Sequence, residues 1–161
     1  MEFEILKVCT INVAIRDASQ AGRFFESLGL AVPFDEPVNL EMPPAQIRYV
    51  SAQIDGGSLS FVEPSSDDSP IARFLDRRGG GMFSLSLEVR GLHRMMSVWG
   101  ERGEQWVLDE PIHFEADPLE ADPPADPRSG VINWTRPAAT PWFLIEVIEC
   151  SRTEHSCLRR T

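Results

Sequence analysis

Cysteine and long apolar runs are scarce in this sequence, and each scarcity excludes a class of protein. The three cysteines, Cys9, Cys150 and Cys157, are an odd number with no spacing typical of a zinc site or a disulfide framework, so we expect reduced thiols. No uninterrupted apolar run reaches the roughly 18 residues that a membrane-spanning helix needs, and the acidic start MEFEILK does not resemble a signal peptide. We therefore expect a cytoplasmic protein that makes no membrane contact.

Positive charge is also in short supply. Lys and Arg number 15 against 25 Asp and Glu, which gives a formal net charge of −10. Such a chain repels a phosphate backbone, and no cluster of Lys and Arg with interleaved aromatic residues offsets that repulsion. We expect no nucleic-acid partner.

What is present suits one folded domain over residues 1–161, because 42% of the residues are hydrophobic. The stretch ILKVCTINVAI alternates like a half-buried strand. After it, Asp17 as N-cap and Gly29 as a left-handed C-terminal residue frame an apolar helical stripe. A short extended piece over residues 30–34 and a Pro-rich loop follow. The strands QIRYVSAQI and SLSFVEP, joined at Asp55-Gly56-Gly57, then predict a hairpin.

The order of elements is then repeated. SPIARFLDRR predicts a short helix that GGG ends, MFSLSLEVR a strand, and residues 92–102 a helix, before the strands QWVLDEP, GVINWTR and PWFLIEVIE. Strand, helix and three strands thus occur twice, which predicts an α+β fold of tandem βαβββ units. We assign the parts as follows: first unit 5–64, connecting helix and glycine linker 65–81, second unit 82–149 with an acidic Pro-rich loop over 114–130, and tail 150–161. The loop is either a solvated excursion or a lid.

The strand MFSLSLEVR raises a question about its second face. Phe83 and Leu85 point one way, whereas Ser84 and Ser86 point the other. Two serines are ordinary if that face meets water, and they are functional candidates if it lines a pocket.

The repeat resembles the vicinal oxygen chelate (glyoxalase/bleomycin-resistance) superfamily over about Leu6 to Glu149. Within it, the segments INVAIRDASQAGRFFESLGL, VEPSSDDSPIARFLDRRGGG, LSLEVRGL and FLIEVIE are most similar to methylmalonyl-CoA epimerases. The resemblance implies a half-open mixed sheet with helices outside, which encloses a cavity for a small molecule and usually for a divalent metal. It also implies a homodimer.

The resemblance places the metal positions at Thr10, Ser60, Ser84 and Glu146. Hydroxyls are poor ligands for a divalent first-row metal, so we expect no metal and no other cofactor. Arg48 appears where the epimerases carry a glutamate base. Methylmalonyl-CoA epimerase activity is therefore not expected.

The residues that remain suggest acid–base chemistry without a metal. Glu146, set among apolar neighbours, is the candidate acid or base, and Arg48 is the candidate partner for a carboxylate or enolate oxygen. The candidate substrate-binding residues are Thr10, Asn12, Ser60, Ser84, Ser86, Trp134 and Trp142. This predicts an isomerase, lyase or cyclase acting on a small carbonyl or carboxylate compound, an acyl thioester among them.

Each of these roles has an alternative. Glu146 and Arg48 could form a buried ion pair, and Ser60 and Ser84 could simply widen the pocket. Trp134 and Trp142 could be core or dimer-interface residues. The whole protein could be a non-catalytic binding protein that sequesters a drug-like compound, as bleomycin-resistance proteins do.

Overall fold

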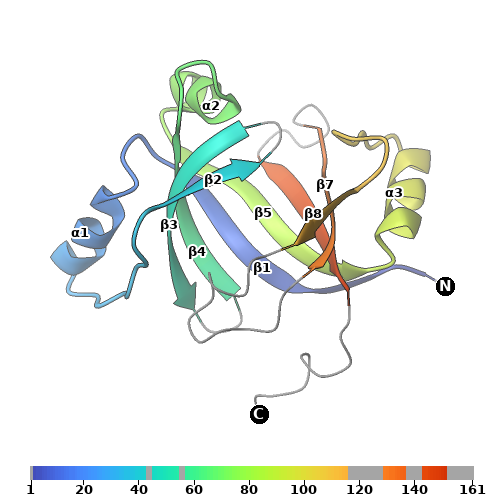
Figure 1. The fold of residues 1–161 in the computed structure, drawn as a ribbon, viewed down its shortest axis with the longest axis horizontal. Coiled ribbons are helices and arrows are strands. Elements are labelled where there is room, and N and C mark those ends of the chain that lie inside the picture. Colours follow the sequence, from blue (N-terminus) through green and yellow to red (C-terminus); the bar gives the residue numbers. More distant parts are fainter. Residues whose placement is uncertain (1, 43–44, 55–56, 116–128, 137–142, 152–161) are drawn as a thin grey trace, which may run out of the picture. The chain divides into compact units, whose positions relative to one another are not determined.

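The computed structural model describes residues 2–42, 45–54, 57–115, 129–136 and 143–151. The elements in chain order are β1 (Glu4–Ala14), α1 (Gln20–Ser27), β2 (Val38–Met42), β3 (Ala45–Ile54), β4 (Gly57–Pro64), α2 (Pro70–Arg78), β5 (Gly81–Arg90), α3 (Leu92–Glu101), β6 (Ile112–Glu115), β7 (Ser129–Trp134) and β8 (Leu144–Cys150). Strand, helix and three strands occur twice with α2 between them (Figure 1). The predicted α+β class and tandem βαβββ order are confirmed.

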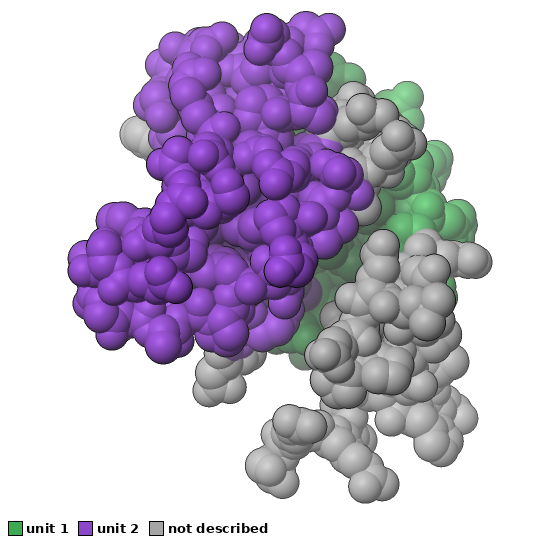
Figure 2. Space-filling model, turned by 60° about the vertical axis from the view of Figure 1, so that its left-hand side comes forward, with its two compact units in different colours: residues 1–7, 87–141, 145–161 green, residues 8–86, 142–144 purple. Residues whose placement is uncertain are grey.

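The described strands form a mixed eight-stranded sheet in the order β2-β3-β4-β1-β5-β8-β7-β6. Strand β1 runs parallel to β4, whereas β2, β3 and β4 are joined as antiparallel neighbours, as are β6, β7 and β8. By compactness the chain divides into unit 1 (residues 1–7, 87–141 and 145–161) and unit 2 (residues 8–86 and 142–144), coloured green and purple in Figure 2. Each unit is described below by itself.

Two strands differ from their predicted positions. The first is β2, which lies at Val38–Met42 rather than at residues 30–34. Pro33 has no N–H to donate to a strand ladder. The ring of Phe34 packs against that of Phe61, with 5.6 Å between the ring centroids. The edge position beside β3 is filled by β2, with Val38 opposite Tyr49.

The second is β6, which lies at Ile112–Glu115 rather than within QWVLDEP. Of that predicted strand, only the bridge between Trp106 and Thr135 forms. The reason is a side chain: Asn133, fully buried, accepts the N–H of Leu108 at 3.2 Å and donates to its C=O at 2.9 Å. The N–H and C=O groups of Leu108 therefore already have hydrogen-bond partners and cannot pair with a neighbouring strand.

The helix ends follow local signals more closely. Helix α2 has Ser69 as N-cap, whose side chain accepts from Ala72 N–H at 3.1 Å, then Pro70, and it ends at Gly79 with φ 79°. Helix α1 begins at Gln20, with Ser19 rather than Asp17 as N-cap. Among the described residues, no helix is long and apolar enough to cross a membrane.

The two faces of the sheet in unit 2 pack against different helices. On one, Ala14 and Val62 contact Ile71 and Leu75 of α2. On the other, Val50 packs with Ala18 and Ala21 at α1, together with the partly buried Phe61. Because Phe61 and Val62 are neighbours on β4, they point to opposite faces, so both faces of this strand carry core.

Candidate functional site

In unit 2, small polar side chains gather on the face of the sheet that carries Ala14 and Val62. Residues opposite one another in adjacent strands share a face, and the pairing sets Thr10 against Ser58, Asn12 against Ser60, and Ser60 against Ser51. Asn12 also reaches Ser84 and Ser86 on β5. We call this set the serine face: Thr10, Asn12, Ser51, Ser58, Ser60, Ser84 and Ser86.

The serine face is closed to water over much of its area. The exposed fractions are 5% for Ser60, 5% for Ser84 and 1% for Ser86. Its hydroxyls bond to one another: Thr10 to Ser58 at 2.9 Å and Ser51 to Ser60 at 3.0 Å, while the Asn12 amide donates to Ser84 at 2.9 Å. The second face of MFSLSLEVR is therefore not a solvated surface.

The serine face does not suit a divalent metal. Thr10, Ser60 and Ser84 offer neutral hydroxyl oxygens that already have hydrogen-bond partners, and a first-row metal needs imidazole, thiolate or carboxylate donors. Within the described ranges, no group of three or more His, Cys, Asp or Glu side chains is arranged to hold a metal ion. The expectation of a metal-free protein thus stays a prediction that the donor chemistry supports, and no step below involves a metal.

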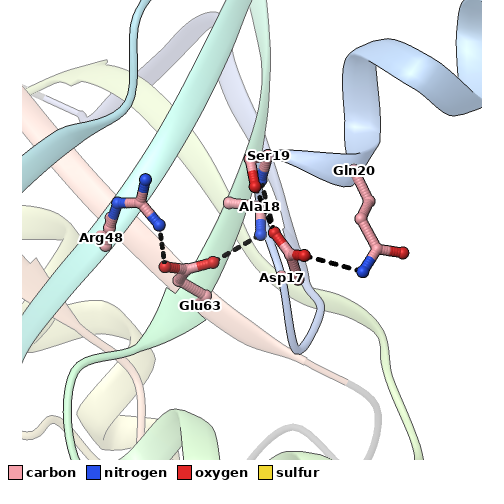
Figure 3. A network of polar contacts seen from close by, with 6 residues as sticks. All are labelled: Asp17, Ala18, Ser19, Gln20, Arg48 and Glu63. Atoms are coloured by element: carbon pink, nitrogen blue, oxygen red, sulfur yellow. Dashed lines mark hydrogen bonds and ion pairs between the residues drawn. The ribbon is translucent and has the colours of Figure 1, made fainter.

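Arg48 lies on the opposite face from the serine face. It stands opposite Glu63 in the β3–β4 pairing, and Glu63 is three residues from Ser60 on β4, so the two point to opposite sides. The Arg48 Nη1 atom is 2.6 Å from Glu63 Oε1 (Figure 3). Arg48 therefore does not share a face with the hydroxyls, and its ion pair is with Glu63 rather than with Glu146.

Glu63 ties β3, β4 and the start of α1 together. Its other oxygen accepts the backbone N–H of Ala18 at 2.5 Å, while its side chain is only 12% exposed. Beside it, Asp17 accepts from the Ser19 N–H at 3.0 Å, the Ser19 hydroxyl and Gln20 Nε2 at 2.7 Å (Figure 3). The hydrogen bond from Ser19, then that from Gln20, holds the pKa of Asp17 below its usual value.

Sequence reasoning missed Glu63. The β3–β4 pairing sets Ile54 opposite Gly57, and counting back along both strands sets Arg48 opposite Glu63. The junction predicted at Asp55-Gly56-Gly57 is one residue longer, so it did not give this register.

In unit 1, Glu146 forms a pair with Trp134. The two are opposite each other in the β7–β8 ladder, and the indole Nε1–H of Trp134 donates to Glu146 Oε2 at 2.6 Å. Both residues are partly buried. A carboxylate that accepts a hydrogen bond from an indole at this distance has a restrained orientation.

The backbone beside this pair is tied on both strands. Thr135 N–H donates to Ile145 C=O at 2.9 Å, and the Thr135 hydroxyl accepts from Ile145 N–H at 3.0 Å. Trp134 N–H donates to the Asn133 side chain at 2.8 Å, and its C=O accepts from Val107 N–H at 2.7 Å. The Cα positions that carry the indole and the carboxylate are therefore held by bonds outside the pair.

Another carboxylate of unit 1 anchors a helix. Glu149 on β8 accepts Gly91 N–H at 2.6 Å and Leu92 N–H at 3.0 Å, at the start of α3. Three predictions fall wholly or largely outside the described residues: Trp142 as a ligand-contacting residue, the lid over 114–130 and the tail over 150–161. Of the described ends of the last two, residues 114–115, 129–130 and 150 belong to β6, β7 and β8.

Comparisons with known proteins bear on the fold. No protein-family model and no curated protein sequence matches the chain. Among solved structures, a hypothetical protein from Bacillus halodurans C-125 matches with TM-score 0.66 at 18% identity, over 97% of this chain and 100% of that one. Methylmalonyl-CoA epimerase from Mycobacterium tuberculosis matches with TM-score 0.66 at 20% identity, over 92% and 90%.

A variant of Streptomyces coelicolor methylmalonyl-CoA epimerase, in complex with 2-nitronate-propionyl-CoA, matches with TM-score 0.66 at 17% identity, over 92% of this chain and 100% of that one. At such identities the likeness establishes the fold alone. The vicinal oxygen chelate type of fold that the resemblance implied is confirmed.

Proposed function

We propose that this chain is a metal-independent enzyme that moves a proton on a small carbonyl or carboxylate compound, acyl thioesters among them, with Glu146 as the acid–base group. One observation carries the proposal: the Trp134 indole donates to the Glu146 carboxylate at 2.6 Å on a ladder whose backbone is tied at the neighbouring pair. The complexes of the structural neighbours with acyl-CoA analogues guide the choice of candidate substrates.

The chemistry asked of Glu146 is modest. A positioned general base takes the proton from the carbon next to a carbonyl and returns it, and such a group accelerates proton transfer by about 100- to 10,000-fold. Exchange of that proton with solvent is the common first step of isomerases and lyases of this kind. Arg48 has no part in this proposal, because Glu63 holds its guanidinium on the α1 face.

The serine face is the second element of the proposal, and it is tested separately. Thr10, Asn12, Ser60, Ser84 and Ser86 offer neutral donors and acceptors that suit uncharged polar groups of a ligand. These residues are proposed to contact the ligand and not to transfer protons.

The test is solvent exchange. The protein, stripped of metal with a chelator, is incubated in D₂O with a panel of acyl-CoA thioesters and 2-keto acids, and deuterium at the α-carbon is measured by mass spectrometry. We expect exchange in the wild type, none in Glu146→Gln, and wild-type exchange in Glu110→Gln, whose side chain is 81% exposed. Exchange that appears only after a divalent metal is restored contradicts the proposal.

A binding protein is the second candidate, and the mutual hydrogen bonds of the serine face favour it. Hydroxyls that bond to one another are not activated for chemistry, yet they can still line a binding surface. If compounds from the panel, or aromatic cationic drugs, bind the wild type and Glu146→Gln equally and no exchange is ever measured, the chain is a binding protein.

A further inference from the structure

The contact between Trp134 and Glu146 defines what the tryptophan does. An indole has a single N–H and no acceptor, so it makes one directed hydrogen bond at a time. Here that N–H is directed at Glu146 Oε2 at 2.6 Å. Trp134 therefore has no polar group left with which to recognise a ligand, and its polar contribution goes to the carboxylate.

The backbone on both sides of this contact is held by hydrogen bonds, so the contact can restrain the Glu146 side chain. On β7, the fully buried side chain of Asn133 accepts the backbone N–H of Trp134. Thr135, on the other side of Trp134, is also fully buried. On β8, Ile145 lies next to Glu146, and both its backbone N–H and its C=O are hydrogen-bonded to Thr135. Because the backbone is held on either side, the rotamers of the indole and of the carboxylate are the freedom that remains. The hydrogen bond between them restrains both.

We propose that Trp134 is a positioning residue for Glu146, which holds the orientation of its carboxylate, and is not an aromatic surface on which a ligand stacks. The inference extends the proposed function, and its consequence for turnover depends on it. The restraint itself does not, because it is measurable in the resting protein. A hydrogen bond to a charged group is a strong one, so its loss has a measurable effect on a proton-transfer rate.

The spectroscopic test follows the indole N–H of ¹⁵N-tryptophan-labelled protein by two-dimensional NMR. The Trp134 signal is assigned by its loss in Trp134→Phe. We expect it to move when Glu146 is changed to Gln, because the indole N–H then loses its carboxylate acceptor. The matched control is Trp106, whose indole donates to the neutral backbone C=O of Met96 at 3.3 Å and whose signal stays in place.

The kinetic test separates positioning from substrate binding. In Trp134→Phe, we expect kcat for α-proton exchange to fall about ten- to a hundredfold, with KM changed by less than about twofold. A benzothienylalanine at position 134 replaces the N–H by sulfur at nearly the same shape. It should reproduce the loss in kcat, even if Trp134→Phe folds poorly.

The outcomes are distinct. A Trp134 signal that ignores Glu146→Gln overturns the inference, as does a Trp134→Phe variant in which KM rises and kcat does not fall. A signal that follows Glu146 while the wild type exchanges no α-protons supports the positioning role and refutes the proposed enzyme. Loss of kcat in both Trp134 variants, with a responsive signal, supports the two together.

Discussion

The last strands of the two repeats, β4 and β8, carry the same residue type at one position and different residue types at another. Each carries a glutamate that accepts backbone N–H groups where the first helix of its repeat begins: Glu63 accepts from Ala18, and Glu149 from Gly91 and Leu92. Three residues earlier, β4 has a serine of the serine face, whereas β8 has Glu146. An offset of three on a strand places the two positions on opposite faces.

The comparison separates support from chemistry. On the side that carries Glu63 and Glu149, both repeats use a carboxylate to accept N–H groups at the start of the first helix of the repeat. On the other side, the repeats differ: neutral hydroxyls bonded to one another in unit 2, and a carboxylate bonded to an indole in unit 1. If function resides in the difference, changes at Glu146 alter activity, and changes at Glu63 or Glu149 alter stability.

The largest effect should come from Glu146→Gln, which makes β8 resemble β4 in carrying a neutral side chain at this position. We expect α-proton exchange to fall by about 100-fold or more, because the amide cannot accept the proton. The thermal midpoint, measured by circular dichroism, should change little. A variant that unfolds at much lower temperature would show instead that Glu146 is structural.

Glycine substitutions sharpen the comparison at the backbone. A Cβ on Gly130 in β7 meets the Glu149 carbonyl and the Phe114 ring, whose Cε1 atom lies 2.9 Å away. On Gly57 in β4, it meets the Cys9 carbonyl at 2.9 Å. We expect Gly130→Ala to lower the free energy of unfolding by about 3 kcal/mol and Gly57→Ala by about 1–2 kcal/mol, measured by urea denaturation. Gly22→Ala in α1, with nothing within 4 Å of its Cβ, should be neutral or slightly stabilising.

Removing the helix-anchoring carboxylates tests whether they are equivalent. Glu63→Ala leaves the Ala18 N–H unpaired and Arg48 without its partner, so we expect a loss of about 2–3 kcal/mol. Glu149→Ala leaves the N–H groups of Gly91 and Leu92 unpaired but frees no charge, so about 1–2 kcal/mol is expected. Equal losses in urea denaturation would show that Arg48, 39% exposed, adds nothing.

The smallest effect concerns Asp17, which has no counterpart at the start of α3. Its pKa is held below the ordinary 3.8 by hydrogen bonds from Ser19 and Gln20. A lowered pKa stabilises the fold above the unfolded value, and this contribution is lost as pH falls through the lower folded value. Asp17→Asn should therefore be slightly less stable than wild type at pH 7. The gap in urea midpoint should close as the pH falls through the lowered pKa of Asp17, and a gap that widens on acidification would contradict the assignment.

Local signals predicted much of the fold. Ser69, Pro70 and Gly79 were enough to predict where helix α2 begins and ends, because a cap, a proline and a left-handed glycine each act within one turn. The strand β5 needed only its alternation. The predicted positions of β2 and β6 were wrong because both are edge strands, and which segment forms an edge strand depends on pairing with the neighbouring strand. Asn133 and Pro33, which removed the alternatives, act through contacts or missing donors that periodicity does not reveal.

The sequence by itself determined the order of the elements, the tandem repeat and the set of small hydroxyl residues, since each of these depends on residue type and spacing along the chain. Only the tertiary structure decided the partners: Arg48 with Glu63, Trp134 with Glu146, and Asn12 with Ser84. The physical reason is that a hydrogen bond depends on strand register and on which face a side chain occupies. A shift of one residue exchanges the two faces, and residue identity alone does not record it.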